Sequence, residues 1–423
     1  MINRRMVEDF FSREISFKGV RRELEVRPLL NKVISIVGPR RSGKTWYFFY
    51  LFERVEDPLY VNLEDVAFRG VRPDEFFDVI KIFSEMKYRP KTVLLDEVQA
   101  MEGWEALVRS LQDRGFRLYV TGSSSKLLPK EISTELRGRS LTYLLLPFSF
   151  REFVSTKGVD VMTMSYENIG QILKNLREYI EFGGFPEVVM TEQKDRVLKE
   201  YFDEFFYRDF VERHGIKSID FGRFLFEFSV QNFSKEMSAK KIKSFFEKKA
   251  SYTTLYSYID KLQDTLVVSF LDRFSESVYT RRSWPRKLYL CDVGIPRVFR
   301  FAEKVGEKME NLVFLELLRR KNESPLLEVF YFKDRQGREV DFVVKEGIKV
   351  KQLIQVTFVS AKDEVEKREV RSLVKASELL KCKDLLTITW DYEDDWDVGG
   401  ARVRFVPLWR WLLEGSTEAA TWR

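Results

Sequence analysis

The segment from residue 32 to residue 55 constrains the fold more than any other part of the sequence. Lys32–Val37 is apolar enough for a buried strand, and Trp46–Val55 has the pattern of an amphipathic helix. The loop between them has the spacing G-x-x-x-x-G-K-T. A strand that enters a helix through such a loop is typical of a P-loop core, an α/β fold with a parallel sheet. The loop residues are Gly38, Pro39, Arg40, Arg41, Ser42, Gly43, Lys44 and Thr45.

This loop predicts that the chain binds ATP and Mg²⁺ as cofactors. Its glycines allow backbone N–H groups to converge on phosphate oxygens, and the N-terminus of the following helix adds positive potential. We expect Lys44 to reach the β- and γ-phosphates and Thr45 to ligate Mg²⁺. A chance match is the alternative, but the strand before the loop and the helix after it argue against chance.

A second apolar strand, Thr92–Leu95, leads into the carboxylates Asp96 and Glu97. In P-loop nucleotidases one carboxylate of such a pair binds in the Mg²⁺ shell, and the other orients the attacking water. We therefore expect Asp96 to hold the metal and Glu97 to act as the catalytic base. The alternative is an ordinary strand that ends in a solvated Asp-Glu turn. The position downstream of the P-loop favours a hydrolase.

Three further polar residues are candidates for the catalytic site. The apolar run Arg117–Thr121 leads through a glycine to Ser123, which could hydrogen-bond the γ-phosphate or the water if the strands are parallel. Arg137 and Arg139 could reach the ATP of a neighbouring subunit and stabilise charge in the transition state. The alternatives are a polar loop for Ser123 and surface or interdomain pairing for either arginine.

Composition excludes several classes of protein. The net charge of +6 arises from 72 basic and 66 acidic residues, so it is only weak support for a nucleic-acid partner. Two distant cysteines and one histidine give no zinc-ligand spacing and favour a reducing, cytoplasmic setting. We see no signal peptide and no apolar run of about 20 residues, so we expect no membrane partner.

The P-loop and several other strings carry a resemblance that covers the chain from about residue 15 to about residue 413. They are Gly38–Thr45, Leu94–Gln99, Thr121–Leu128, Leu136–Ser140, Leu146–Phe153, Gly183–Glu187, Lys287–Gly294 and Glu310–Glu316. With these strings the chain resembles the archaeal and bacterial AAA+ ATPases that carry a DUF4143-type C-terminal region. The resemblance implies an AAA+ core, a helical lid, a winged-helix segment and a restriction-nuclease-like α/β domain. We place these parts at residues 1–160, 161–214, 215–280 and 281–423.

The expected winged-helix segment carries a basic face. Lys240, Lys241 and Lys243 lie on its second predicted helix, and Arg281 and Arg282 follow near its end. Such a cluster could bind DNA phosphates. The alternative is a solvated helix face on a segment that serves only as structure.

The C-terminal region reads as helix, three strands, helix and strand, which is the core of restriction-nuclease-like folds. Its functional positions would be Glu316 on the first helix, Asp341 on the second strand and Gln355 on the third. Thr357 stands where active members would carry a lysine that stabilises charge on the scissile phosphate. We therefore expect a degenerate nuclease site that binds DNA without cutting it. The alternative is that Asp341 supports folding or subunit contacts.

Together these features predict an ATP-hydrolysing, DNA-associated homo-oligomer, a hexameric ring that acts as a motor or remodeller on duplex or branched DNA, junctions included. One alternative is an ATP-gated switch whose C-terminal region grips a protein. Another is an ATP-controlled DNA nuclease, which Thr357 disfavours.

Overall fold

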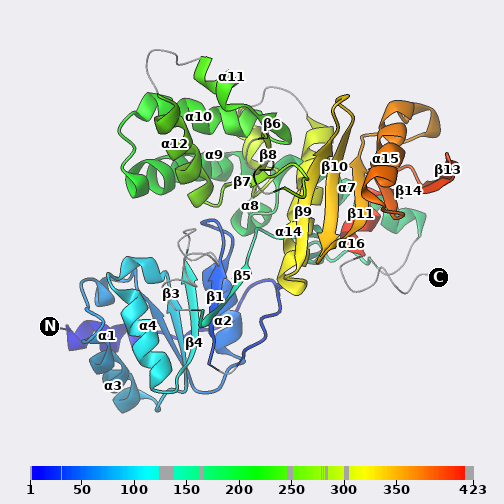
Figure 1. Cartoon of the computed structure of the whole chain (residues 1–423). Coiled ribbons are helices and arrows are strands. Elements are labelled where there is room, and N and C mark those ends of the chain that lie inside the picture. The colour runs from blue at the N-terminus through cyan, green and yellow to red at the C-terminus, as the bar shows by residue number, and fades with distance from the viewer. Residues whose placement is uncertain are drawn as a thin grey trace. The chain divides into compact units, whose positions relative to one another are not determined.

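The chain forms two compact units in its computed structural model (Figure 1). Unit 1 comprises Met1–Leu146 with Asp264–Leu266, and unit 2 comprises Pro147–Gln263 with Val267–Arg423. The finer division into four domains, with boundaries at residues 160, 214 and 280, stays a prediction. The structure describes residues 2–29, 31–122, 138–161, 165–244, 251–277, 279, 281, 284–299 and 304–414.

Unit 1 is built on a five-stranded sheet in which all neighbouring strands are parallel, as predicted. The order across the sheet is β2-β3-β4-β1-β5. Every residue of β1 and β3 is buried, which explains their unbroken apolar character. The strands are β1 (Val33–Val37), β2 (Pro58–Asn62), β3 (Thr92–Asp96), β4 (Arg117–Gly122) and β5 (Ser140–Leu144).

The order of the strands matters because β4 lies between the P-loop strand β1 and the acidic strand β3. The carboxyl ends of these three strands therefore meet at one edge of the sheet. Helix α2 packs on β3 and helix α4 on β4, while α1 packs on α3. The helices of this unit are α1 (Arg4–Ser12), α2 (Lys44–Phe52), α3 (Phe76–Met86) and α4 (Trp104–Asp113), with short 3₁₀ turns at Val66–Phe68 and Val98–Ala100.

Unit 2 begins with a helical region. An aromatic stripe at its centre is buried and forms part of the packing; its members are Tyr201, Phe202, Phe205, Phe206 and Phe210. The helices are α6 (Phe150–Thr156), α7 (Tyr166–Phe182), α8 (Pro186–Met190), α9 (Lys194–Glu204), the π-helix η4 (Phe205–Glu212) and α10 (Ile219–Gln231).

A small antiparallel sheet follows, with the order β6-β8-β7. Along the chain its elements are β6 (Lys235–Met237), α11 (Ala239–Ser244), α12 (Tyr252–Asp264), β7 (Val268–Leu271) and β8 (Arg286–Leu290). Together with α10 they alternate in the order that a winged helix requires. The winged-helix assignment itself stays a prediction.

The C-terminal part of unit 2 contains a mixed six-stranded sheet in the order β13-β14-β12-β11-β10-β9. Strands β11, β12 and β14 are parallel, and the other neighbours are antiparallel. The predicted order of helix, three strands, helix and strand is confirmed. The elements are η5 (Ile295–Phe299), α14 (Val305–Glu323), β9 (Leu327–Lys333), β10 (Glu339–Glu346), β11 (Lys349–Val356), η6 (Lys362–Glu364), α15 (Lys367–Leu380), β12 (Leu385–Thr389), β13 (Asp394–Val398), β14 (Ala401–Pro407) and α16 (Leu408–Leu413).

Asp292 connects two of the segments that carry the family resemblance, Gly183–Glu187 and Lys287–Gly294, both in unit 2. Its carboxylate accepts N–H bonds from Gly184 at 2.7 Å and from Gly294 at 2.8 Å. A Cβ atom on Gly183 would lie 1.7 Å from an Asp292 oxygen, and the positive φ of +79° also favours glycine there. Burial raises the pKa of Asp292 to about 6. Gly183 and Gly184 therefore pack directly against the segment Asp292–Gly294, and the contact between them is buried.

Among the described residues, no helix combines the length and the apolar composition that crossing a lipid bilayer demands.

Candidate functional site

The phosphate-binding loop is held in a tight, partly left-handed conformation. A Cβ atom on Gly38 would lie 2.1 Å from the carbonyl oxygen of Leu145, so only glycine fits there. Arg41 and Gly43 adopt positive φ values of 67° and 95°, which turns the chain into α2. Because α2 starts at Lys44, its unbonded N–H groups open onto the loop. Pro39 and Ser42 are buried, Arg40 is half-buried and Arg41 is exposed.

Lys44 lies across this loop and is only 4% exposed. Its ammonium donates to the carbonyl oxygens of Gly38 and Pro39, each at 3.2 Å. A carboxylate oxygen of Glu97 lies 3.8 Å from the ammonium. The lysine is thus held by two neutral acceptors of the loop itself, which leaves its charge available to a phosphate.

Asp96 is fully buried at the end of β3. It accepts hydrogen bonds from the hydroxyls of Thr45 at 2.8 Å, Tyr60 at 2.9 Å and Thr121. Burial, together with the negative charge of Glu97, raises the pKa of Asp96. The structure therefore brings together Thr45 and Asp96, the two residues expected to hold Mg²⁺.

Glu97 adopts a left-handed backbone with φ of 52°, a conformation that costs a non-glycine residue about 1–3 kcal/mol. Its backbone N–H donates to the Thr121 hydroxyl at 3.0 Å, and Gln99 donates to its carboxylate. This support fixes Glu97 beside Lys44 at the edge of the loop. Sequence reasoning missed Thr121 and Tyr60; a hydroxyl near the end of a buried strand was the available signal.

The residues present fit a Mg²⁺–nucleotide. Ser42 Oγ is buried in the loop and has no hydrogen-bond partner among the described residues, so phosphate oxygens would satisfy it. In the described part of the chain, no three His, Cys, Asp or Glu side chains are grouped to hold a metal by themselves. Mg²⁺ commonly takes one or two protein ligands plus phosphate oxygens and waters, and Thr45 and Asp96 carry oxygen atoms of the required kind.

Arg22 is a part of this site that sequence reasoning did not find. It is buried, and its guanidinium donates to the carbonyl of Ser42 at 2.8 Å and to that of Leu146 at 2.6 Å. It therefore ties the phosphate loop to the chain just beyond β5. Nothing in the sequence pattern around this single arginine points to such a role.

The three other predicted catalytic residues are placed as follows. Ser123 and Arg137 lie outside the described residues. Arg139 precedes β5 and accepts a backbone bond from Val33, so it sits at the amino edge of the sheet, opposite the P-loop of its own chain. Its side chain is half exposed and pairs with Asp113 at 2.8 Å. Arg139 therefore lies away from the P-loop of its own chain, and a role at the ATP of another subunit stays a prediction.

Comparisons with known proteins agree with this geometry. Residues 30–154 match the model of an AAA domain. Residues 173–301 and 305–411 match two domains of unknown function, DUF8612 and DUF4143. An uncharacterized protein of Methanocaldococcus jannaschii, MJ1544, is 36% identical over 94% of this chain and 91% of its own length. The chain belongs to this family of AAA-domain proteins with a C-terminal DUF4143 region.

More distant relatives extend the comparison. An uncharacterized protein of Haemophilus influenzae is 27% identical over 89% of this chain and 93% of its own length. Among solved structures, Cdc6p from Pyrobaculum aerophilum is 12% identical over 63% of this chain and 86% of its own length, with a TM-score of 0.25. A DNA polymerase III gamma subunit-related protein from Thermotoga maritima is 13% identical over 69% of this chain and 95% of its own length, with a TM-score of 0.24. Both likenesses are too distant to inform the function.

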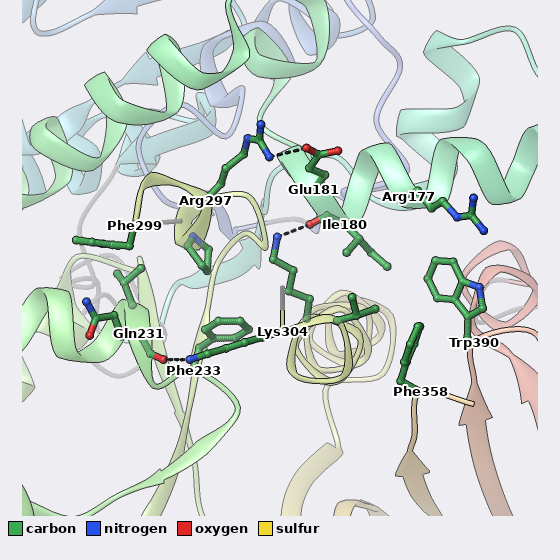
Figure 2. Close-up of a pocket in the computed structure, with 14 residues that line it drawn as sticks. Arg177, Ile180, Glu181, Gln231, Phe233, Arg297, Phe299, Lys304, Phe358 and Trp390 are labelled. Atoms are coloured by element: carbon green, nitrogen blue, oxygen red, sulfur yellow. Dashed lines mark hydrogen bonds and ion pairs between the residues drawn. The ribbon is translucent and has the colours of Figure 1, made fainter. Parts of the chain in front are cut away.

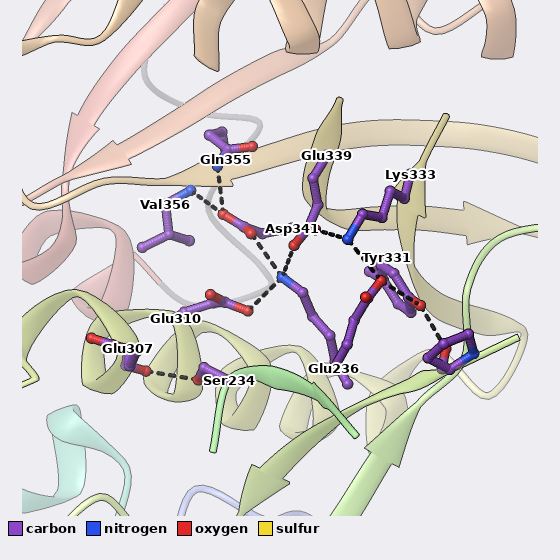
Figure 3. Close-up of polar contacts among 12 residues, drawn as sticks. Ser234, Glu236, Glu307, Glu310, Tyr331, Lys333, Glu339, Asp341, Gln355 and Val356 are labelled. Carbon is purple, nitrogen blue, oxygen red and sulfur yellow. Dashed lines mark hydrogen bonds and ion pairs between the residues drawn. The ribbon is translucent and has the colours of Figure 1, made fainter. Parts of the chain in front are cut away.

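A second buried lysine–carboxylate cluster joins Lys287 to carboxylates of the DUF4143 region, and we call it the DUF4143 cluster (Figure 3). Lys287, on β8, donates to Glu310 at 3.0 Å and Asp341 at 3.0 Å, and lies 2.6 Å from Glu339. Asp341 also accepts from the Gln355 amide at 2.8 Å and from the backbone N–H of Val356 at 2.9 Å. Asp341 and Gln355 are thus brought together, as predicted.

Glu316 does not join this cluster, contrary to the expectation for a nuclease-like site. Its carboxylate pairs with Arg151 at 2.7 Å and lies 3.6 Å from Arg319. The helical residue that reaches Lys287 and, through it, Asp341 is Glu310. Six residues separate Glu310 from Glu316, which turns their side chains about 120° apart around α14.

The surroundings of Glu310 favour a proton on this carboxylate. Three carboxylates contact Lys287, and one of them, Glu339, also pairs with Lys333 at 3.2 Å. Burial raises the pKa of Glu310 to about 8 against the effect of Lys287, and the Tyr289 hydroxyl donates to Glu310 at 2.6 Å. Burial acts to lower the pKa of Lys287, but Glu310 and Asp341 outweigh it and raise that pKa well above its ordinary value. The lysine therefore stays charged while Glu310 tends to hold a proton.

Lys345 of β10 and Lys351 of β11 do not replace the lysine missing at Thr357. Lys345 pairs with Glu328, and Lys351 with Glu346 at 3.2 Å, so neither approaches Asp341 as a substitute. Lys287 is the cation that the structure supplies, and it comes from a strand before the nuclease-like elements begin. Its interactions with three carboxylates leave it little capacity to contact a phosphate.

The predicted DNA-binding residues are spread over two places. Lys240 is exposed on α11, and the Lys243 ammonium lies 5.3 Å from the ring centre of Tyr252. Lys241 lies on the same helix, but its side chain is outside what the structure describes, and so is Arg282. Arg281 lies over the ring of Phe330 at 5.4 Å.

Proposed function

We propose that the chain is a Mg²⁺-dependent ATP hydrolase whose base is Glu97. The observation that supports this most is the convergence of a buried lysine, a hydroxyl and two carboxylates at one sheet edge, on a loop that only glycine can form. A bound Mg²⁺–ATP would supply the γ-phosphoryl group and the charge compensation for its transfer.

In this proposal each residue has a separate task. Lys44 exchanges two carbonyl acceptors for phosphate oxygens, and Ser42 donates its unused hydroxyl. Thr45 and Asp96 hold the metal, directly or through water. Glu97, fixed by Thr121, orients the attacking water and receives its proton.

We further propose that this ATPase works on duplex or branched DNA, junctions included, as a hexameric ring in the cytoplasm. Tyr252 and Tyr256 are half exposed on α12 next to Lys243, so α11 and α12 offer rings and cations on one surface. An arginine finger in trans would be Arg139. The cytoplasmic setting is supported by Cys291 and Cys382, which are buried and form no disulfide.

The test has two arms. ATP hydrolysis is measured with Mg²⁺ and with EDTA, and then with single-stranded, duplex, forked and four-way DNA. The proposal expects no turnover in EDTA and a rate that rises with at least one duplex or branched DNA.

A matched pair of variants tests the DNA surface. Replacing Lys240 and Lys243 with Ala should flatten the plot of log affinity against log salt by about one unit per lost phosphate contact. Replacing Lys367 and Lys375, two exposed lysines of α15, is the control and should leave the slope unchanged. Equal slopes in both double variants would rule out the α11–α12 surface.

A further inference from the structure

Unit 2 contains a cavity of about 580 Å³ that the proposed ATPase chemistry does not use (Figure 2). It is lined by the end of α7, the end of α10, the turn η5, the start of α14, and the segments that follow β11 and β12. Its volume lies in the range of small-molecule sites. Because β11 and β12 are parallel neighbours, the cavity includes the carboxyl edge of the sheet, where α/β proteins commonly bind ligands.

The cavity carries more positive than negative charge. Among the lining residues that the structure describes, Glu181 is the one acidic side chain, and it pairs with Arg297, while Arg177, Lys304 and Lys308 are basic. Lys304 donates to the backbone carbonyl of Gln231 at 2.5 Å, a neutral acceptor. Burial and the nearby Lys235 lower the pKa of Lys304, against the effect of Glu307 in the first turn of α14. Glu307 already pairs with Lys235 at 3.3 Å, which leaves Lys304 for an anionic ligand.

The first turn of α14 offers a place for that anion. The helix is 19 residues long, its N-cap Lys304 makes no side-chain capping bond, and Val305 lines the cavity. The first N–H groups of a helix have no acceptor within it, and they attract phosphate. Lys304 and the helix N-terminus thus present positive potential to the same cavity.

Beside this turn lies an uncovered aromatic ring. Phe358 is 54% exposed, although it lines the cavity and contacts Trp390 with ring centres 5.6 Å apart. A Cβ atom on Gly306 would lie 4.0 Å from the Phe358 side chain, which places Phe358 next to the first turn of α14. The other phenylalanines of the lining are already engaged: Phe233 is buried, and Phe299 packs on Phe202.

We propose that this cavity binds one nucleotide unit, with its base stacked on Phe358 and its phosphate at the α14 N-terminus and Lys304. A planar ring beside a phosphate site is the combination that recognises an unpaired nucleotide. The unit can come from a free nucleotide or from the end of a nucleic-acid strand. The inference does not rest on ATP hydrolysis.

The test uses the full chain with Lys44→Ala, which removes binding at the P-loop. Affinity is measured for deoxythymidine 5′-phosphate, ribose 5-phosphate, a short 5′-phosphorylated single strand and a blunt duplex that lacks 5′-phosphates. Phe358→Ala and Lys304→Met are introduced on this background. Their controls are Leu379→Ala, an apolar residue of similar exposure at 56%, and Lys349→Met, an exposed lysine on β11. Thermal melting confirms that each variant folds.

We expect the mononucleotide or the single strand to bind more tightly than ribose 5-phosphate and the duplex. Phe358→Ala should weaken that binding about 5- to 150-fold, the range measured for loss of one stacked base. Lys304→Met should weaken it and reduce its salt dependence, while both controls bind as the parent does. Tighter binding of the mononucleotide identifies a free nucleotide as the source, and tighter binding of the strand identifies a strand end.

Three results would overturn the proposal: affinity that is the same in all variants, affinity for ribose 5-phosphate equal to that for the nucleotide, or no binding of either nucleotide source. Any of them would leave the ATPase proposal intact, because the Lys44→Ala background does not measure it.

Discussion

Lys44 in unit 1 and Lys287 in unit 2 are both buried lysines next to acidic residues, and they differ in what holds them. Lys44 donates to two backbone carbonyls and is 3.8 Å from the carboxylate of Glu97. Lys287 is within 3.0 Å of three carboxylates. A neutral acceptor can be exchanged for a phosphate at little cost, whereas leaving a buried carboxylate uncompensated is expensive.

This difference separates a site that can accept an anionic ligand from one that is already satisfied. In the P-loop, the Lys44 ammonium and the Ser42 hydroxyl can both donate hydrogen bonds to an incoming phosphate. In the DUF4143 cluster, the ammonium stands among the carboxylates that a metal ion would need. The same residue types therefore give a candidate catalytic site in one unit and an internal ion cluster in the other.

The largest expected effect is on stability. Lys287→Met should lower the free energy of unfolding of unit 2 by about 3–5 kcal/mol, because it leaves buried carboxylates without their cation. Lys44→Met should cost less, since its closest acceptors are neutral. Urea unfolding followed by circular dichroism compares the two. Equal losses would remove the distinction between the two lysines.

The next effect is on turnover. Glu97→Gln should keep ATP binding and lower the hydrolysis rate about 10²- to 10⁴-fold, because the general base is lost while the phosphate loop remains. Glu339→Gln is the control in the other cluster and should hydrolyse ATP at the parent rate. Steady-state turnover and nucleotide binding are measured on both. A parent-like rate in Glu97→Gln would show that another group activates the water.

A smaller effect concerns pH. The pKa of Glu310 is raised to about 8 in the folded chain from an ordinary value of 4.5, so between these values the folded state keeps a proton that the unfolded state releases. The contribution of Glu310 to stability is therefore complete below pH 4.5 and is lost as pH rises to about 8. Its slope is at most about 1.4 kcal/mol per pH unit.

Comparing the parent with Glu310→Gln isolates this slope, because other raised groups such as Asp292 and Glu369 remain in both chains. Unfolding free energies are measured from pH 5 to pH 9. If the parent and the variant lose stability in parallel, Glu310 holds no proton in the folded state.

The smallest expected effect is none at all. We expect no cleavage of duplex, forked or four-way DNA with Mg²⁺ or Mn²⁺, with or without ATP, because Lys287 binds the carboxylates and Thr357 supplies no cation. Gel analysis of end-labelled DNA checks this. Cutting that disappears in Asp341→Ala would make the cluster a nuclease site and the nuclease alternative the first hypothesis.

The sequence could predict those site residues that lie close together along the chain, and it could not predict those that only the fold brings together. The P-loop is contiguous, so its chemistry follows from spacing alone, and β3 delivers Asp96 and Glu97 as an adjacent pair. Thr121 and Tyr60 reach Asp96 only because β4 and β2 flank β3, and strand order is not written in any short pattern. Their roles therefore had to come from the structure.

The DUF4143 cluster shows the same limit more strongly. Asp341 and Gln355 were found because they occupy neighbouring strands of a recognisable order. The prediction of Glu316 is wrong because packing sets the rotation of α14 about its axis, which the sequence does not reveal, and this rotation turns Glu310 toward Lys287. Lys287 lies more than 50 residues before Asp341, on β8 of a different sheet, so no spacing rule could have connected the two.

Arg22 links the phosphate loop to the segment after β5 through two hydrogen bonds. One guanidinium holds the carbonyl of Ser42 and the carbonyl of Leu146, so the loop cannot shift against Leu146 without losing one of these bonds. Leu146 is also where unit 1 ends, and Pro147 begins unit 2. Arg22 therefore fixes the position of the phosphate loop relative to the last residue of the first segment of unit 1.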